Sequence, residues 1–127
     1  MREIKFRGLC VRDNKQWVYG SCQKLDALKY PGIIEPKRGG KCYEVLPETV
    51  GQYTGLTDRN EVDMYDGDIV TCPGHPDNLT GRIYYNEVAG GFSILQDGIC
   101  HYPDRFWKWS DLKVIGNIHQ NPELLNK

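Results

Sequence analysis

The stretch GQYTGLTDRNEVDMYDGDIV, residues 51–70, decides how this chain is interpreted, because glycines, aromatic residues and five carboxylates crowd into it. Asp and Asn tolerate turn conformations and bond their own backbone, and a consecutive Asp-Gly pair is a tight-turn signal. The stretch therefore predicts a strand, a turn and the start of another strand. We predict structural turn residues at Gly51, Gly55, Asp58, Asn60, Gly67 and Asp68.

The same carboxylates do not form a calcium loop, which follows the pattern D-x-[DN]-x-[DN]-G-x5-E. With Asp58 as the first ligand, Val62 stands at a ligand position, Asp63 replaces the glycine and Ile69 replaces the closing Glu. The pattern fails at three of its positions. We therefore expect Asp68 to accept local backbone N–H groups and expect no metal or other cofactor.

Composition predicts one mainly β domain. The chain has 127 residues with 14 Gly, 7 Pro, 8 Tyr, 3 Trp and 3 Phe, which favours short strands and tight turns over helices. We expect one domain over residues 1–127, with a basic β-hairpin region at 1–50 and a barrel region at 51–127.

The N-terminal region predicts two hairpins. EIKFRGLCV and QWVYGSC flank the turn residues RDNK, and GII and KCYEVL flank a longer loop with the tip PKRGGK. CQKLDALK is the one stretch between them that fits a short helix.

The C-terminal half predicts an SH3-like, partly open β-barrel. Its order is the strand DIV, a loop, the strand GRIYY, a turn, the strand FSIL, a turn at Asp97-Gly98, and the last buried strand LKVIGNI. Asn121 can cap a short C-terminal helix that begins at Pro122.

The charge is unevenly distributed. Residues 1–42 hold ten Lys/Arg and four Asp/Glu, or +6, whereas residues 43–127 hold six and thirteen, or −7. Either the basic part faces an external polyanion, or the two parts neutralise one another within the fold or between subunits. We favour the second interpretation, because a dedicated nucleic-acid domain is strongly basic overall and this chain has a net charge of −1.

The chain predicts a cytoplasmic protein with no membrane partner. Met1 is followed directly by REIKFR, and no long apolar run is present. The five cysteines are widely spaced and form no C-x-x-C motif, which indicates ordinary thiols in a reducing compartment.

The sequence disfavours two kinds of chemical site. Zinc would need Cys72 and His75 together with Cys100 and His101, but adjacent residues on a strand point to opposite faces. Phosphate-binding, nucleophile-elbow and H-E-x-x-H motifs are absent from the sequence. An enzyme is therefore the weakest of the three function classes considered, and we expect no catalytic residues.

Aromatic residues interleaved with cations are the signal for nucleic acid. If RFWKWSD were a strand, alternate residues would share a face and form a stacking platform for unpaired bases. The alternative is that the tryptophans belong to the core or to a partner interface. The candidate residues for nucleic-acid or partner binding are Lys37, Arg38, Lys41, Tyr84, Arg105, Trp107, Lys108 and Trp109.

Four ordered blocks resemble the YopX family of phage and prophage proteins: REIKFRGLCVRDNKQWVYG, TVGQYTGLTDRN, YDGDIV and VIGNIHQNPELL. Glu61 departs from the family pattern, since relatives usually place a glycine there, and this bears on the tightness of that turn. The resemblance implies a mainly β fold, a phage or prophage context in bacteria and no established activity.

These observations together predict a phage- or prophage-derived accessory protein that is not an enzyme. We expect it to act through protein contacts and self-association, as a homo-oligomer or with a protein partner. Nucleic-acid binding through the basic N-terminal region and the aromatic barrel face is the alternative, and an uncharacterised enzyme is the second alternative.

Overall fold

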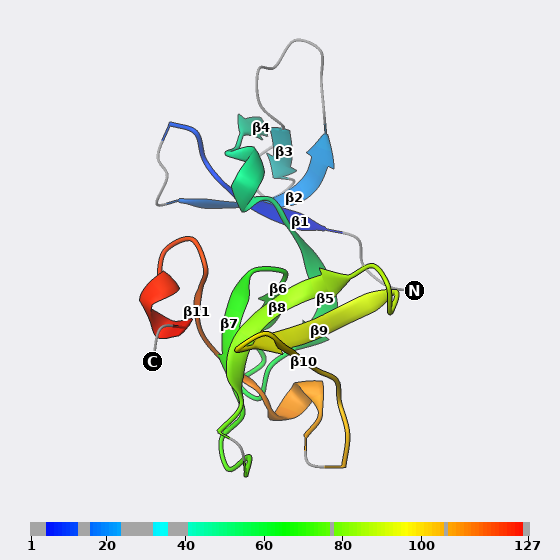
Figure 1. The fold of residues 1–127 in the computed structure, drawn as a ribbon. Coiled ribbons are helices and arrows are strands. Elements are labelled where there is room, and N and C mark those ends of the chain that lie inside the picture. Colours follow the sequence, from blue (N-terminus) through cyan, green and yellow to red (C-terminus); the bar gives the residue numbers. More distant parts are fainter. Residues whose placement is uncertain are drawn as a thin grey trace. The chain divides into compact units, whose positions relative to one another are not determined.

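The structure is a computed structural model that describes residues 5–12, 16–23, 32–35, 41–76, 78–105 and 107–125. The chain forms two compact units, Met1–Tyr53 and Thr54–Lys127 (Figure 1). Most of the predicted helix in CQKLDALK and of the PKRGGK tip lies outside the described residues. The boundary between the units falls a few residues after the division that the sequence suggested.

Two antiparallel hairpins build the first unit. Its elements are β1 (Phe6–Leu9), β2 (Trp17–Gln23), β3 (Gly32–Glu35), β4 (Lys41–Glu44), the 3-10 turn η2 (Pro47–Thr49) and the first part of β5 (Gly51–Thr57). β1 pairs with β2 and β3 pairs with β4, which are the two hairpins that the turn residues predicted. β2 joins the hairpins by pairing with β3.

A small apolar cluster holds the first unit together. Cys10, Val18, Ile33 and Val45 are buried against one another. Gly8 lies directly beneath Val45, so that a Cβ added there would sit 2.8 Å from the Val45 Cβ. Only a residue without a side chain lets β1 approach Val45 this closely.

The second unit is dominated by a five-stranded antiparallel sheet in the order β10-β9-β8-β7-β11. Its elements are β6 (Asp63–Tyr65), β7 (Asp68–Thr71), β8 (Thr80–Asn86), β9 (Gly91–Gln96), β10 (Ile99–His101), η3 (Trp109–Asp111), β11 (Lys113–Asn117) and η4 (Pro122–Leu125). Asp97 and Gly98 both have positive φ, 50° and 79°, and join β9 to β10 in a two-residue turn.

The mainly β prediction is confirmed, and three details differ from expectation. Over the described residues, no sheet closes into a barrel. The prediction that the last strand is buried is wrong, because β11 pairs only with β7 at the edge of the sheet and Lys113 is exposed. At the C-terminus the structure has a 3-10 turn, η4, where a short helix was expected.

The core of the second unit is built around Trp107, which is only 1% exposed. It packs with seven other buried residues: Met64, Val70, Cys72, Leu79, Ile83, Ile94 and Leu112. The strand considered for RFWKWSD, on which the stacking platform depended, is not found among its described residues. Trp107 and Lys108 lie in an irregular segment, and Trp109 begins η3.

Within the described residues, no helix is long and apolar enough to cross a membrane.

Candidate functional site

The Asp58 carboxylate organises the turn after β5. Its Oδ1 accepts N–H groups of Asn60 at 2.8 Å and Val62 at 2.9 Å, and its Oδ2 accepts the N–H of Val114 at 3.0 Å. Burial alone would raise the pKa of Asp58, but these donors and the nearby Arg59 charge hold the pKa below its ordinary value. The carboxylate is thus used within the fold.

The Asp66-Gly67 turn is hydrogen-bonded to the segment VIGNIHQNPELL, which we call the C-terminal motif. Gly67 has φ of 94°, donates its N–H to the Ile83 carbonyl at 2.8 Å and accepts the Ile118 N–H at 2.9 Å. Asp68 accepts the Tyr65 N–H at 2.8 Å and is buried. The segments YDGDIV and VIGNIHQNPELL therefore meet at Gly67, although they are far apart in the sequence.

Asn117 closes the C-terminal motif. Its Oδ1 accepts the N–H groups of His119 at 3.0 Å and Gln120 at 2.9 Å, while its own N–H donates to the Asn121 Oδ1 at 3.2 Å. Gly116 lies so close that an added Cβ would be 2.7 Å from that oxygen. These residues of the C-terminal motif therefore stabilise the fold.

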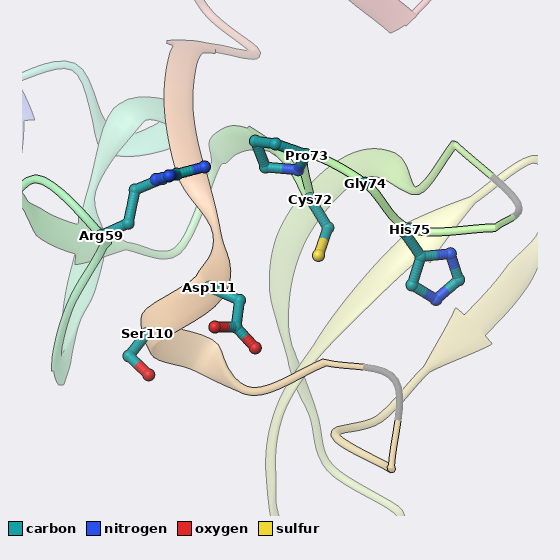
Figure 2. Close-up of a pocket in the computed structure, with 7 residues that line it drawn as sticks. All are labelled: Arg59, Cys72, Pro73, Gly74, His75, Ser110 and Asp111. Atoms are coloured by element: carbon teal, nitrogen blue, oxygen red, sulfur yellow. The ribbon is translucent and has the colours of Figure 1, made fainter.

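One pocket in the second unit brings together residues from three segments. It has a volume of about 400 Å³ and lies between the turn after β5, the loop after β7 and η3 (Figure 2). Its lining residues are Arg59, Cys72, Pro73, Gly74, His75, Ser110 and Asp111. Cys72 and His75 are both buried, and both are labelled in Figure 2.

The pocket does not have the electrostatics of a thiol nucleophile. Burial, with a further contribution from Asp111, raises the pKa of the Cys72 thiol above its ordinary value, and Arg59 opposes this. The reactive form of cysteine is the thiolate, which a raised pKa depletes. In the part of the chain that the structure describes, no three His, Cys, Asp or Glu side chains come together to hold a metal ion.

The residues proposed for nucleic-acid or partner binding are in different environments. Lys37 and Arg38 lie outside the described residues, and Lys41 is exposed on β4. In the second unit, Arg105 and Lys108 are exposed, but Trp107 is buried in the core. Trp109 packs edge-on against Trp107 with ring centroids 5.4 Å apart. The two tryptophans therefore form no open stacking platform.

Tyr84 belongs to a hydrogen-bonded cluster formed by residues of β8, of β10 and of the segment that follows β10. Its hydroxyl lies 2.7 Å from the Cys100 Sγ, and the Asn86 amide donates to the hydroxyls of Tyr84 at 3.3 Å and Tyr102 at 2.8 Å. The bond to Cys100 raises the pKa of Tyr84. The alternation of residues 84 and 86 on β8 could have shown that they share a face, but their partners on β10 depend on the register.

Sequence reasoning missed four exposed apolar side chains on and beside the strands β8 to β10. They are Tyr85, Val88, Ile99 and Tyr102, which we call the apolar surface; their exposed fractions are 45%, 99%, 61% and 45%. Tyr85 and Val88 lie at the β8–β9 end of the sheet, and Ile99 lies at the β9–β10 turn. Tyr102 is on the other face from Tyr85, because it bonds Asn86. Figure 1 shows β8, β9 and β10 as neighbouring strands, and the paired registers agree. Val88, on the β8–β9 turn, is the most exposed of the four.

Comparison with solved structures identifies a protein of similar fold. The crystal structure of protein EF1440 from Enterococcus faecalis matches with a TM-score of 0.57 and 24% sequence identity, covering 98% of this chain and 99% of that one. At this identity the match shows the fold alone.

Curated relatives match over a small part of their length. The acetyl-coenzyme A synthetases of Desulfatibacillum aliphaticivorans and Syntrophobacter fumaroxidans are 35% and 36% identical over 78 and 90 residues. These matches cover 58% and 65% of this chain but only 12% and 14% of the synthetases.

The family model described as "YopX protein" matches residues 5–126, nearly the whole chain. Its span includes the two motifs that meet at Gly67. The chain belongs to the YopX family.

Proposed function

We propose that this protein is a phage- or prophage-derived accessory protein that works in the bacterial cytoplasm by binding proteins, itself included, and not by catalysis. The exposure of Val88, the most exposed residue of the apolar surface, is the observation that carries the proposal. Burying one large apolar side chain contributes roughly 1.5–3 kcal/mol, so that Val88 together with Tyr85 at the same end of the sheet can support a contact.

An ordered turn presents the most exposed member of this surface. The Asn86 Oδ1 accepts the N–H groups of Val88 at 3.1 Å and Ala89 at 3.2 Å, and the Gly90 N–H donates to the Asn86 carbonyl at 2.8 Å. A side chain held on a fixed turn loses less conformational freedom on binding than one on a floppy loop. Val88 is thus suited to be an anchor for a partner.

The charge distribution supports protein contacts and assembly. Residues 1–53 hold ten Lys/Arg and six Asp/Glu, or +4, and residues 54–127 hold six and eleven, or −5. Opposite charges on two units of one chain favour contacts between copies, or between the chain and charged proteins, and speed their encounter.

Two observations favour this proposal over its alternatives. The burial of Trp107 takes the central aromatic out of the nucleic-acid surface, leaving the exposed cations Arg105 and Lys108 without an open stacking platform between them. The raised pKa of Cys72 disfavours a thiolate in the pocket. The SH3-like character of the second unit also stays a proposal, supported by the order of its strands along the chain.

Photo-crosslinking in bacterial cells tests the proposal. A photoreactive amino acid replaces Val88, and a matched variant carries it at Lys113, which is exposed on β11 at the other edge of the sheet. We expect discrete protein adducts from position 88 and few from position 113. Equal yields at both positions, or adducts with nucleic acid alone, would contradict it.

A further inference from the structure

We propose that the edge strand β10 pairs with β10 of a second copy of this chain, in an antiparallel arrangement that joins two five-stranded sheets into one of ten strands. This inference rests on the proposed function and names one partner of the apolar surface, namely the chain itself.

The backbone N–H and C=O groups of β10 point alternately toward β9 and away from it. Ile99 pairs with Gln96 and closes the two-residue turn at Asp97 and Gly98. The pair that closes such a turn exchanges hydrogen bonds, and the next pair along an antiparallel ladder does not. Cys100 therefore directs its N–H and C=O away from β9, toward the open edge of the sheet.

The two edges of this sheet differ in their protection. β11 begins with the exposed Lys113, and its register with β7 shifts between Val114 and Gly116. Both features hinder pairing at an edge. β10 consists of Ile99, Cys100 and His101, with no Lys, Pro or carboxylate, and Ile99 is 61% exposed. The β10 edge therefore lacks the features that hinder strand pairing at the β11 edge.

A second copy fits this edge because the edge is self-complementary. One outward N–H and one outward C=O on Cys100 can make two reciprocal bonds about a two-fold axis, the commonest symmetry of soluble oligomers. Antiparallel pairing sets Asp97 of one copy opposite the segment after β10 of the other. That segment carries the exposed cations Arg105 and Lys108 against one carboxylate, Asp104.

Side chains must supply most of the contact, because a three-residue strand forms few backbone bonds. Ile99 of one copy would lie beside His101 of the other, and Tyr102 of each copy would pack next to the partner's turn. We therefore expect a dimer that forms at micromolar concentrations. Its affinity should fall moderately as the salt concentration rises, because salt screens the exposed charge pairs between the two copies.

The test is sedimentation velocity over a range of concentrations, with four variants that separate the edge from the rest of the surface. Ile99→Lys places a charge on the edge, and Cys100→Pro removes the outward N–H, which an edge strand tolerates. Cys100→Ser keeps the backbone and is the matched control for the thiol. Val88→Lys alters the apolar surface away from the β10 edge.

We expect Ile99→Lys and Cys100→Pro to be monomers, and Cys100→Ser and Val88→Lys to dimerise like the wild type. Circular dichroism shows whether each variant is folded. In the wild type, hydrogen exchange of the Cys100 amide should slow at least several-fold as the protein is concentrated, while the amides of Ile99 and His101 stay unchanged. This readout needs no variant at all.

Three outcomes overturn the inference. One is a wild-type protein that stays monomeric at about 100 µM, well above the micromolar range expected for such a contact. The second is a dimer that survives both edge variants. The third is a dimer lost only in Val88→Lys, which would keep the proposed function and move self-association from β10 to the β8–β9 turn. Failure of the crosslinking experiment alone would instead remove the partner-binding function.

Discussion

Asp58 and Val114 lie 56 residues apart in the sequence and are joined by a hydrogen bond of 3.0 Å from the Val114 N–H to the Asp58 Oδ2. The same carboxylate fixes its own turn through Asn60 and Val62. Asp58, in the densest acidic segment of the chain, therefore connects the turn after β5 to β11.

Replacing Asp58 should cost stability. Asp58→Ala leaves three backbone N–H groups without their acceptor, and we expect unfolding to become easier by about 2–3 kcal/mol. Asp58→Asn keeps the shape and one acceptor oxygen and should lose less. Urea unfolding at pH 7 measures both, and an Asp58→Ala variant as stable as the wild type would contradict this role.

Asp58 should also make stability depend on pH. Its pKa is lowered in the folded state, so its contribution is present above the unfolded pKa of about 3.9 and is lost as the pH falls through the folded value. Wild-type protein should lose more stability than Asp58→Asn between pH 6 and 3, because the amide does not titrate. Parallel urea titrations check this, and identical losses in the two proteins would disprove it.

Glu61 is a position where substitution should stabilise the protein. Its φ is 63°, in the left-handed region that favours glycine. We expect Glu61→Gly to raise the free energy of unfolding by about 1 kcal/mol. Glu61→Ala removes the same side chain without relieving the backbone and serves as the control. A glycine variant no more stable than the alanine variant would argue against strain at this turn.

Gly116 should tolerate no side chain. A Cβ there would lie 2.7 Å from the Asn121 Oδ1 and 2.9 Å from the Leu124 Cδ1, so that Gly116→Ala should cost about 1–3 kcal/mol. Gly91→Ala is the matched control, since nothing lies within 4 Å of its added Cβ. Thermal unfolding compares them, and equal midpoints would show that the C-terminal motif yields to an added methyl group.

The pocket thiol should react slowly. The raised pKa and burial of Cys72 predict that iodoacetamide at pH 8 modifies the exposed Cys42 and Cys100 well before Cys72. Mass spectrometry of digested protein gives the order of labelling. If Cys72 were labelled first, the pocket would hold an activated thiol and the enzyme alternative would gain support.

Local patterns predicted the β content and the hairpins, because turn signals such as Asp97-Gly98 act within a few residues. They could not predict that Trp107 is buried, since its burial depends on packing against strands distant in the sequence. The exposure of Val88 and Ile99 escaped prediction for the same reason. An apolar residue at a turn or an edge looks like core until its surroundings are known.

The measurement that tests the central claim most directly is an amide NMR spectrum of labelled protein in buffer and in bacterial lysate. If binding uses the apolar surface, signals of residues 85–102 should broaden most in lysate, and Val88→Lys should reduce the broadening. Broadening confined to residues 51–70 would contradict the account and would indicate that the acidic turn is the binding site.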